Sequence, residues 1–232
     1  MRFGAFQAVK DVSFSLAEGE ALGIVGPNGA GKTTLFSLIA GSLTPSAGSI
    51  SLASESLVGK DAAARCLAGI GRTHQVPRPF LGMTVFENAL VAAQHGSGLP
   101  AGAAERGAAE ALTRTGLSAL ANRPAAALGL LDRKRLELAR ALATAPRVLL
   151  LDEIGGGLTE AELITLVGLI SELKADGLSI IWIEHILHAL LKVIDRLICM
   201  SVGEIIAEGD PQAVMRDPSV MAAYLGGIEE HA

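Results

Sequence analysis

A glycine-rich octapeptide near the start of the chain has the residue types needed to bind phosphate. The stretch GPNGAGKT, Gly26 to Thr33, matches the pattern G-x-x-x-x-G-K-[ST]. Its glycines let the backbone curl so that N–H groups point at phosphate oxygens. Lys32 reaches the β- and γ-phosphates, and the Thr33 hydroxyl is a ligand for Mg²⁺. The stretch predicts a nucleoside triphosphate site made of Gly26, Pro27, Asn28, Gly29, Ala30, Gly31, Lys32, Thr33 and Thr34.

A pair of carboxylates, Asp152 and Glu153, follows an apolar run further along the chain. In RVLLLDE (147–153), four apolar residues place the pair at the carboxyl end of a buried strand, where ligands bind in α/β sheets. Asp152 is expected to hold Mg²⁺ through water, and Glu153 to orient or deprotonate an attacking water. On its own the motif also fits an ordinary strand end with solvated carboxylates. The phosphate-binding pattern upstream favours the nucleotide site.

The octapeptide is flanked by the elements that a phosphate-binding loop requires. Residues 20–26 (EALGIVG) form a short apolar run that ends in glycine, which predicts a buried strand. Residues 32–41 (KTTLFSLIAG) have helical spacing and a glycine stop. The helix N-terminus adds partial positive charge to the site. The alternative is a glycine loop that precedes a helix by chance, and the full pattern in this context disfavours it.

Buried strands separated by helices predict a mostly parallel sheet covered on both faces, which is an α/β fold. Between residues 76 and 145 the composition shifts to alanine-rich helical segments punctuated by glycine and proline, which predicts a helical subdomain. The other expected elements are strands at 12–16, 48–52, 69–75 and 178–185, helices that start at the capping boxes Thr84 with Glu87 and Thr159 with Glu162, a hairpin that turns at Gly203, and short helices after residue 210.

Composition argues against several classes of function. The 232 residues fit one domain, or a core with a subdomain. Mean hydropathy is +0.44, yet the apolar runs are interrupted by charges or too short to span a bilayer. The first residues alternate like a strand and lack the apolar core of a signal peptide, so we expect a cytoplasmic location. A net charge of −5 and 3% aromatic residues argue against a nucleic-acid surface.

The cysteines and histidines predict no metal centre. Cys66 and Cys199 stand in apolar surroundings without pairing or ligand spacing, so buried free thiols are expected. The five histidines form no metal-ligand pattern either.

The order of the motifs resembles that of ATP-binding cassette ATPases. GPNGAGKT is followed by Gln75, a helical insert, LLLDE and then His185 in IEH. GIGRTHQVPRPFLGMTVFENALVAA and the segment from IIWIEH to AYLG are similar to the ATPase subunits of branched-chain amino acid importers. The resemblance covers nearly the whole chain. An Asn-Lys-x-Asp motif that reads guanine is missing, which disfavours a GTPase.

The resemblance implies a P-loop NTPase fold, a function and a set of partners. Residues 1–75 and 146–232 would form a RecA-like core with an antiparallel β portion near the N-terminus, and 76–145 the inserted helical subdomain, within one domain (1–232). The chain would bind ATP and Mg²⁺, pair with an identical or a different ATPase subunit, and hydrolyse ATP to power transport. The helical subdomain would grip permease subunits at the inner face of the plasma membrane.

Roles can be carried over to three single residues. Phe3 stands where the family places the aromatic that stacks on adenine; the alternative is a core phenylalanine. The strand that commonly precedes this aromatic is missing, which would weaken the adenine pocket. Gln75 would contact Mg²⁺ or the attacking water. His185 would donate a hydrogen bond to the γ-phosphate; the alternative is a packed histidine at a strand end.

A five-residue segment departs from the family pattern. The family completes each ATP site with the partner's signature loop, LSGGQ, or LAYGD in this subgroup, which aligns here with Leu128, Gly129, Leu130, Leu131 and Asp132. Leu131 stands where the family has glycine, and its side chain is expected to crowd a phosphate and restrict the turn. Ile154 replaces a common proline.

Two shapes fit this segment. In the favoured shape the segment is a loop, Asp132 caps the helix, and the helix starts at Arg133 with its dipole aimed at a partner's nucleotide. In the other shape one helix runs from Pro124 through the whole segment. Basic residues 133–135 in a first turn oppose the dipole, which fits a nearby phosphate or a solvated basic face.

These observations predict an ATPase subunit of an importer for amino acids or related small solutes. With Leu131 in place, the chain's own site would be sound and the site that it completes in its partner would be weak. The alternative is a regulatory ATP-binding subunit that barely hydrolyses, for which the degenerate signature is the support. A soluble kinase-like enzyme would need a second substrate pocket, for which there is no motif.

Overall fold

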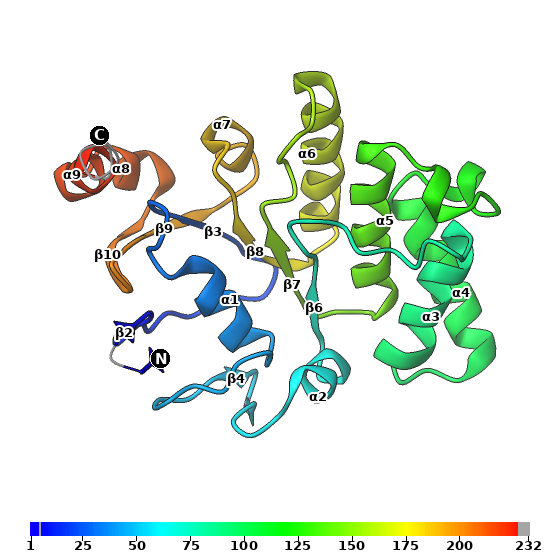
Figure 1. The fold of residues 1–232 in the computed structure, drawn as a ribbon, viewed down its shortest axis with the longest axis horizontal. Coiled ribbons are helices and arrows are strands. Elements are labelled where there is room, and N and C mark those ends of the chain that lie inside the picture. The colour runs from blue at the N-terminus through cyan, green and yellow to red at the C-terminus, as the bar shows by residue number, and fades with distance from the viewer. Residues whose placement is uncertain (5, 227–232) are drawn as a thin grey trace.

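The computed structural model describes residues 1–4 and 6–226, and its centre is a six-stranded sheet (Figure 1). The strand order is β10-β9-β3-β8-β7-β6, and every pair is parallel except β9 with β10. The predicted mostly parallel α/β sheet is therefore confirmed. The strands are β3 (Ala21–Val25), β6 (Ile70–Arg72), β7 (Val148–Asp152), β8 (Ser179–Ile183), β9 (Arg196–Ser201) and β10 (Glu204–Gly209).

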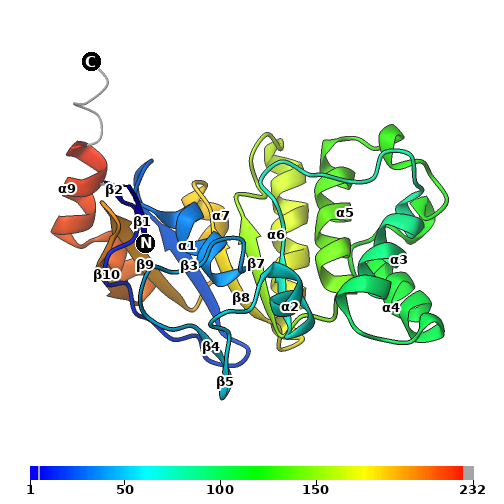
Figure 2. The ribbon, with the colours of Figure 1, turned by 60° about the horizontal axis from the view of Figure 1, so that its bottom comes forward.

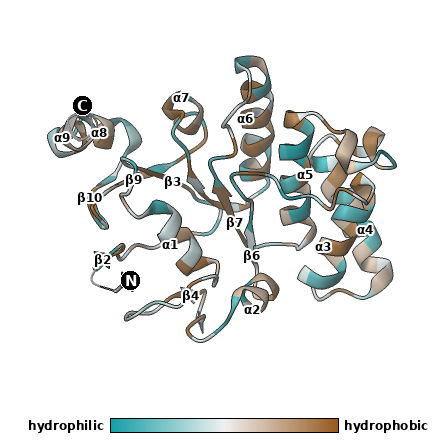
Figure 3. Ribbon diagram, viewed as in Figure 1, coloured by the Kyte–Doolittle hydropathy of each residue, from teal (hydrophilic) through white to brown (hydrophobic). Residues whose placement is uncertain are grey.

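Both faces of the sheet are buried, which explains why the central strands read as continuous apolar runs. All five residues of β3, β7 and β8 are buried. Alternate residues enter two separate cores: Leu22 and Ile24 face helix α1, whereas Leu149 and Leu151 face the side of α6. Figure 3 shows the hydrophobic colour along these strands. The covering helices are α1 (Lys32–Ile39) on one face and α6 (Glu160–Ala175) and α7 (Leu187–Leu190) on the other.

Within residues 85–143 the chain forms helices joined by turns, and these helices lie at one end of the molecule (Figure 2). Helices α3, α4 and α5 pack on one another. Ala89, Ala93, Ala104 and Ala108 are fully buried, and such small side chains allow the helices to approach closely. The elements are α3 (Val85–Gly96), α4 (Ala101–Arg114), α5 (Leu130–Ala143) and 3₁₀ turns at Ser118–Leu120 and Ala125–Ala127; α2 (Ala62–Leu67) precedes β6.

Both predicted capping boxes are present. Thr84 and Glu87 exchange hydrogen bonds at the start of α3, and Thr159 and Glu162 do so at the start of α6. Gly41, with φ of 80°, follows α1, as its glycine stop predicts. Local sequence therefore determines where these helices begin and end.

The N-terminal third contains the expected antiparallel strands, but they are short. They form two hairpins in which each strand has two residues: β1 (Arg2–Phe3) with β2 (Phe6–Gln7), and β4 (Ser51–Leu52) with β5 (Glu55–Ser56). The prediction of a strand at 12–16 is wrong. Val12, Phe14 and Leu16 alternate toward the core as a strand would, but no described strand lies beside them to form a ladder.

The last elements follow the prediction. Strands β9 and β10 form a hairpin that turns at Val202 and Gly203, both at positive φ. Helices α8 (Pro211–Met215) and α9 (Pro218–Gly226) come next, and residues 227–232 of the predicted core lie outside the described residues. Among the helices described, none combines the length and the apolar character needed to cross a membrane.

Candidate functional site

The candidate residues gather at the carboxyl ends of four neighbouring strands. The glycine-rich loop follows β3, and His185 comes two residues after β8. Asp152 ends β7 and Glu153 follows it, and Gln75 lies three residues beyond β6. These strands are adjacent in the order β3-β8-β7-β6, so residues far apart in sequence meet at one edge of the sheet.

The glycine-rich loop has a backbone that only glycine can supply. Gly26 and Gly31 have φ of 145° and 100°. A Cβ on Gly26 would lie 2.1 Å from the Met200 carbonyl oxygen, and one on Gly31 would lie 2.4 Å from that of Ala8. Close approach to neighbouring backbone, as well as positive φ, therefore requires glycine at both positions.

Lys32 is buried and turned onto the loop. Its Nζ donates hydrogen bonds to the carbonyl oxygens of Gly26 (2.7 Å) and Pro27 (3.0 Å). Burial lowers the pKa of Lys32, although the charges of Glu153, Cys199 and Asp152 oppose this shift. A phosphate oxygen near this ammonium would supply an anionic partner in place of lost water.

Gln75, Glu153 and His185 meet around one carboxylate. The Gln75 Nε2 donates to Oε2 of Glu153, and the His185 Nε2 lies 2.6 Å from Oε1. Glu153 has φ of 47°, a left-handed conformation that is uncommon for glutamate, and its N–H donates to the Ile183 carbonyl at 2.8 Å. The structure thus brings together Glu153, which its own motif singled out, and Gln75 and His185, whose roles the resemblance implied.

Asp152 is paired with a residue that the sequence analysis missed. Its Oδ2 accepts a hydrogen bond of 2.9 Å from Arg72 at the end of β6, and the carboxylate is almost fully buried. Arg72 also reaches Ser37 Oγ of α1 at 3.4 Å. Nothing in the stretch GIGRTHQ reveals this pairing, because it depends on β6 lying beside β7.

The oxygen atoms at this edge suit Mg²⁺. The Thr33 hydroxyl, the Gln75 amide oxygen and the Asp152 carboxylate are hard donors of the kind that this ion prefers. Because Gln75 turns its nitrogen toward Glu153, its oxygen remains free to accept or to coordinate. The residues therefore fit the ion, although no metal is part of the structure.

A second missed cluster surrounds Glu137 of α5, whose side chain is 5% exposed. The Glu137 carboxylate lies 2.7 Å from His74 Nδ1 and accepts hydrogen bonds from the Arg78 N–H (3.3 Å) and from Arg140 (3.1 Å). Burial alone would raise the pKa of Glu137. The His74 hydrogen bond and the Arg140 charge hold this pKa below its ordinary value.

The Glu137 contacts fix the segment around Gln75. His74 and Arg78 lie on either side of Gln75 in sequence, so Glu137 ties that segment to α5. Arg140 strengthens the tie, because it also donates to the Arg78 carbonyl (2.7 Å) and lies 5.0 Å from the Phe80 ring centroid.

The segment aligned with the signature loop adopts neither expected shape. Gly129 is the N-cap, in an extended conformation, and α5 begins at Leu130. Asp132 lies in the first turn, so its prediction as the N-cap is wrong. The single helix from Pro124 is also wrong, because a 3₁₀ turn and the extended Leu128 interrupt it.

Leu131 does not restrict the turn as predicted. It is the second residue of α5, where leucine adopts helical φ and ψ without strain, and its half-buried side chain packs against the core. The neighbouring Leu130 is 43% exposed. Crowding of a partner's phosphate by Leu131 stays a prediction.

The basic residues after Asp132 do not form a solvated face. Lys134 is 4% exposed; burial lowers its pKa, and the charge of Glu184 opposes that shift. Arg135 pairs with Asp132 at 3.4 Å, and Arg133 donates to a backbone carbonyl. Glu184 accepts the Gly155 N–H at 3.0 Å, so its carboxylate lies against the turn after Glu153.

The remaining predicted residues have simpler surroundings. Phe3 is 48% exposed on β1, so it is no core phenylalanine and its ring is available for stacking. Ile154 is buried in the core. Both cysteines are free, as predicted, but only Cys199 is buried, whereas Cys66 is half-buried.

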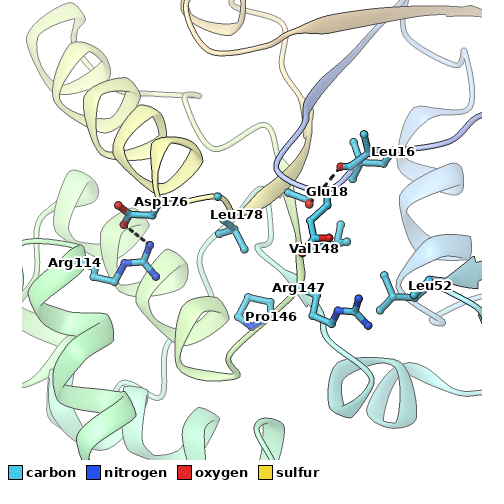
Figure 4. Close-up of a pocket in the computed structure, with 13 residues that line it drawn as sticks. Leu16, Glu18, Leu52, Arg114, Pro146, Arg147, Val148, Asp176 and Leu178 are labelled. Atoms are coloured by element: carbon cyan, nitrogen blue, oxygen red, sulfur yellow. Dashed lines mark hydrogen bonds and ion pairs between the residues drawn. The ribbon is translucent and has the colours of Figure 1, made fainter.

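One cavity of the described part of the chain lies away from these residues. Its volume is about 410 Å³, and it opens at the amino ends of β7 and β8, where Pro146, Arg147 and Ser179 line it (Figure 4). Arg114 of α4 and Asp176 after α6 form an ion pair of 2.8 Å at its rim. A cavity of about 240 Å³ borders the Glu137 cluster instead.

A phosphate-binding loop between a buried strand and a helix, with paired carboxylates two strands away, defines a P-loop nucleoside triphosphatase. The model of the ABC transporter family matches residues 9–155, so this chain belongs to that family and is an ATPase. A second model, described as "Branched-chain amino acid ATP-binding cassette transporter", matches residues 204–230. The resemblance found in the sequence is therefore confirmed.

Relatives and solved structures agree with this assignment. The chain is 40% identical to the high-affinity branched-chain amino acid transport ATP-binding protein LivG of Salmonella typhimurium, over 97% of this chain and 94% of LivG. It is 36% identical to BraF of Pseudomonas aeruginosa, a protein of the same description, over the same shares. The ADP conformation of MJ1267, an ATP-binding cassette of an ABC transporter, superposes with a TM-score of 0.88 at 33% identity, covering 97% of this chain and 95% of that one.

Proposed function

We propose that this chain is the ATP-hydrolysing subunit that powers an importer for branched-chain amino acids or related small solutes. One observation carries the proposal: the Glu153 carboxylate, held by Gln75 and His185, lies at the same sheet edge as the Lys32 loop. The names of LivG and BraF support the class of solute.

The roles of the residues follow from their positions. Lys32 and the N–H groups of residues 26–34 hold the phosphates, and Phe3 stacks on adenine. Thr33, Gln75 and Asp152 hold Mg²⁺, which neutralises phosphate charge when it is bound. Glu153 orients and deprotonates water, while His185 donates a hydrogen bond to the γ-phosphate.

The proposal includes partners. A second ATPase subunit, identical or different, faces the start of α5, and permease subunits dock on the helices of residues 76–145 at the inner face of the membrane. Residues 1–75 and 146–232 then act as the core that carries the nucleotide. If the partner is a different subunit, we expect this chain to contain an active site and, because Leu131 replaces glycine, to complete a weak one in that partner.

Steady-state phosphate release by the assembled transporter tests the proposal. Glu153→Gln should lower turnover about 100-fold or more and leave ATP binding intact, because only the base is lost. The exposed Glu172→Gln is the matched control. The equivalent glutamate-to-glutamine change in the partner should cost several-fold less. Equal losses would contradict the asymmetry.

Leu131 also favours a second candidate, a regulatory subunit that binds ATP and barely hydrolyses it. The same assay separates the two, since a regulatory subunit would leave turnover unchanged after Glu153→Gln.

A further inference from the structure

The first amide of the phosphate-binding loop is held by a residue from the far end of the sequence. Gly26 is buried, and its N–H donates a hydrogen bond of 2.9 Å to the hydroxyl of Tyr224 in α9. Buried N–H groups are almost always paired, most often within helices and sheets. Here the partner is a single side chain 198 positions along the chain.

The other sides of Gly26 are also occupied. Its carbonyl accepts a hydrogen bond from Lys32 Nζ at 2.7 Å, and the Met200 carbonyl lies where a Cβ would be. Both its N–H and its carbonyl are thus fixed by side chains. Loss of the Tyr224 hydroxyl would leave a buried donor without a partner unless the loop shifts.

Helix α9, which carries Tyr224, is held in place by hydrogen bonds at its start and by a buried side chain. Asp217 accepts hydrogen bonds from the N–H (2.8 Å) and the hydroxyl of Ser219 at the start of the helix. Val220 is 1% exposed in the core, and Pro218 suits the first turn of a helix. Burial raises the pKa of Tyr224, so its hydroxyl is neutral at physiological pH.

We propose that Tyr224 is a positioning residue that holds Gly26 in its phosphate-binding conformation, and that α9 is a latch on the nucleotide site. Tyr224 does not touch the nucleotide. Docked α9 keeps the loop ordered before ligand arrives, so less order must be created on binding. By linkage, nucleotide strengthens the docking of α9 to the same extent. The proposal rests on the proposed function, because it takes the ligand to be a nucleotide.

Tyr224→Phe removes the hydroxyl and keeps the ring. We expect the dissociation constants of ADP and of a non-hydrolysable ATP analogue, measured by equilibrium titration with Mg²⁺, to rise about 2- to 10-fold, the net contribution of one hydrogen bond. ADP and ATP should be affected alike, because loop N–H groups cradle the α- and β-phosphates. The control is Met221→Ala, an exposed side chain on the same helix, with an unchanged constant.

Two further measurements separate positioning from stability. Val220→Ala loosens α9 without touching the loop and should weaken nucleotide binding, with a double variant less than additive with Tyr224→Phe. Tyr224 is the only tyrosine of the chain, so ¹³C-tyrosine labelling gives one set of NMR signals, which should shift on ADP binding. If wild type binds and Tyr224→Phe binds equally well, this proposal alone is overturned. If wild type binds no nucleotide, the proposed function fails with it.

Discussion

The two segments expected to contact nucleotide phosphate, the glycine-rich loop and the start of α5, are held in different ways. The loop is fixed by polar contacts: its own Lys32 binds the Gly26 carbonyl, and two distant residues add to this, Tyr224 on the Gly26 N–H and the Gly203 N–H on the Ala30 carbonyl at 3.0 Å. The start of α5 has an N-cap glycine without a capping side chain, and it is held by the packing of Leu131 and by short-range polar contacts of Arg133 and Arg135.

The difference separates a requirement of the fold from a requirement of function. Glycine at position 26 is enforced by neighbouring backbone, whereas position 131 is helical and accepts leucine without strain. In the dimer proposed above, any cost of Leu131 would therefore fall on the partner's nucleotide and not on the stability of this chain.

The largest effect is expected from Glu137→Gln, because Glu137 connects α5 with the segment of Gln75. We expect turnover to fall by up to about 100-fold with unchanged nucleotide affinity, since a displaced Gln75 misplaces the reacting groups without removing them. Steady-state kinetics beside equilibrium binding would measure this, with Glu172→Gln as the control. Normal turnover in Glu137→Gln would show that α5 and the Gln75 segment work independently.

The same variant has a pH signature. Because the pKa of Glu137 lies below its ordinary 4.5, its charge stabilises the fold above that pH, and this stabilisation is lost as pH falls through the folded pKa. Urea denaturation should therefore show a larger difference between wild type and Glu137→Gln at pH 7 than at pH 4. A difference independent of pH would mean that packing, and not charge, is responsible.

A smaller effect is expected from Leu131→Gly, which restores the glycine of the family pattern. The assay uses an assembled transporter in which Glu153→Gln inactivates the ATP site of this chain, so that only the partner's site turns over. Leu131→Gly should raise that turnover about tenfold, the value of one hydrogen bond to a charged group. Leu130→Gly is the matched control, because it frees the backbone one residue earlier. If both variants behave alike, Leu131 is not the cause of the asymmetry.

The last prediction requires no substitution and concerns the thiol beneath the loop. Cys199 lies on β9 opposite Val25 of β3. Burial raises the pKa of the Cys199 thiol to about 11. At pH 8 only about 0.1% is thiolate, so it should react with a disulfide reagent at least about 100-fold more slowly than a free thiol. Stopped-flow thiol titration should show equal, fast reaction of both cysteines only in denaturant. Fast native reaction of Cys199 would mean that the base of the loop opens readily.

Local sequence was enough to predict most elements and to single out residues that the structure brings together at one sheet edge. The glycine loop, the carboxylate pair and the capping boxes each depend on fewer than ten consecutive residues, so the sequence alone is enough to predict them. The strand at 12–16 failed because alternation reports burial, whereas a strand also needs a neighbour to pair with.

The missed residues depend on which strands lie side by side. Arg72 meets Asp152 because β6 borders β7, and Tyr224 meets Gly26 across 198 positions. The predicted start of α5 is wrong by three residues for a related reason. The capping preference of aspartate predicts Asp132 as the N-cap, although the extended Gly129 performs that role with no side chain.

The strand order has a consequence for biosynthesis. Strand β3, which precedes the loop, pairs only with β8 and β9 among the described strands, and Ala21 lies opposite Ile180. Roughly 160 residues must therefore leave the ribosome before β3 finds its first neighbour, which takes on the order of 10 to 30 s at typical translation rates. During that interval the apolar segment ALGIV has both edges unpaired, so this chain should depend on chaperones in the ribosome's vicinity more than a protein with sequential hairpins.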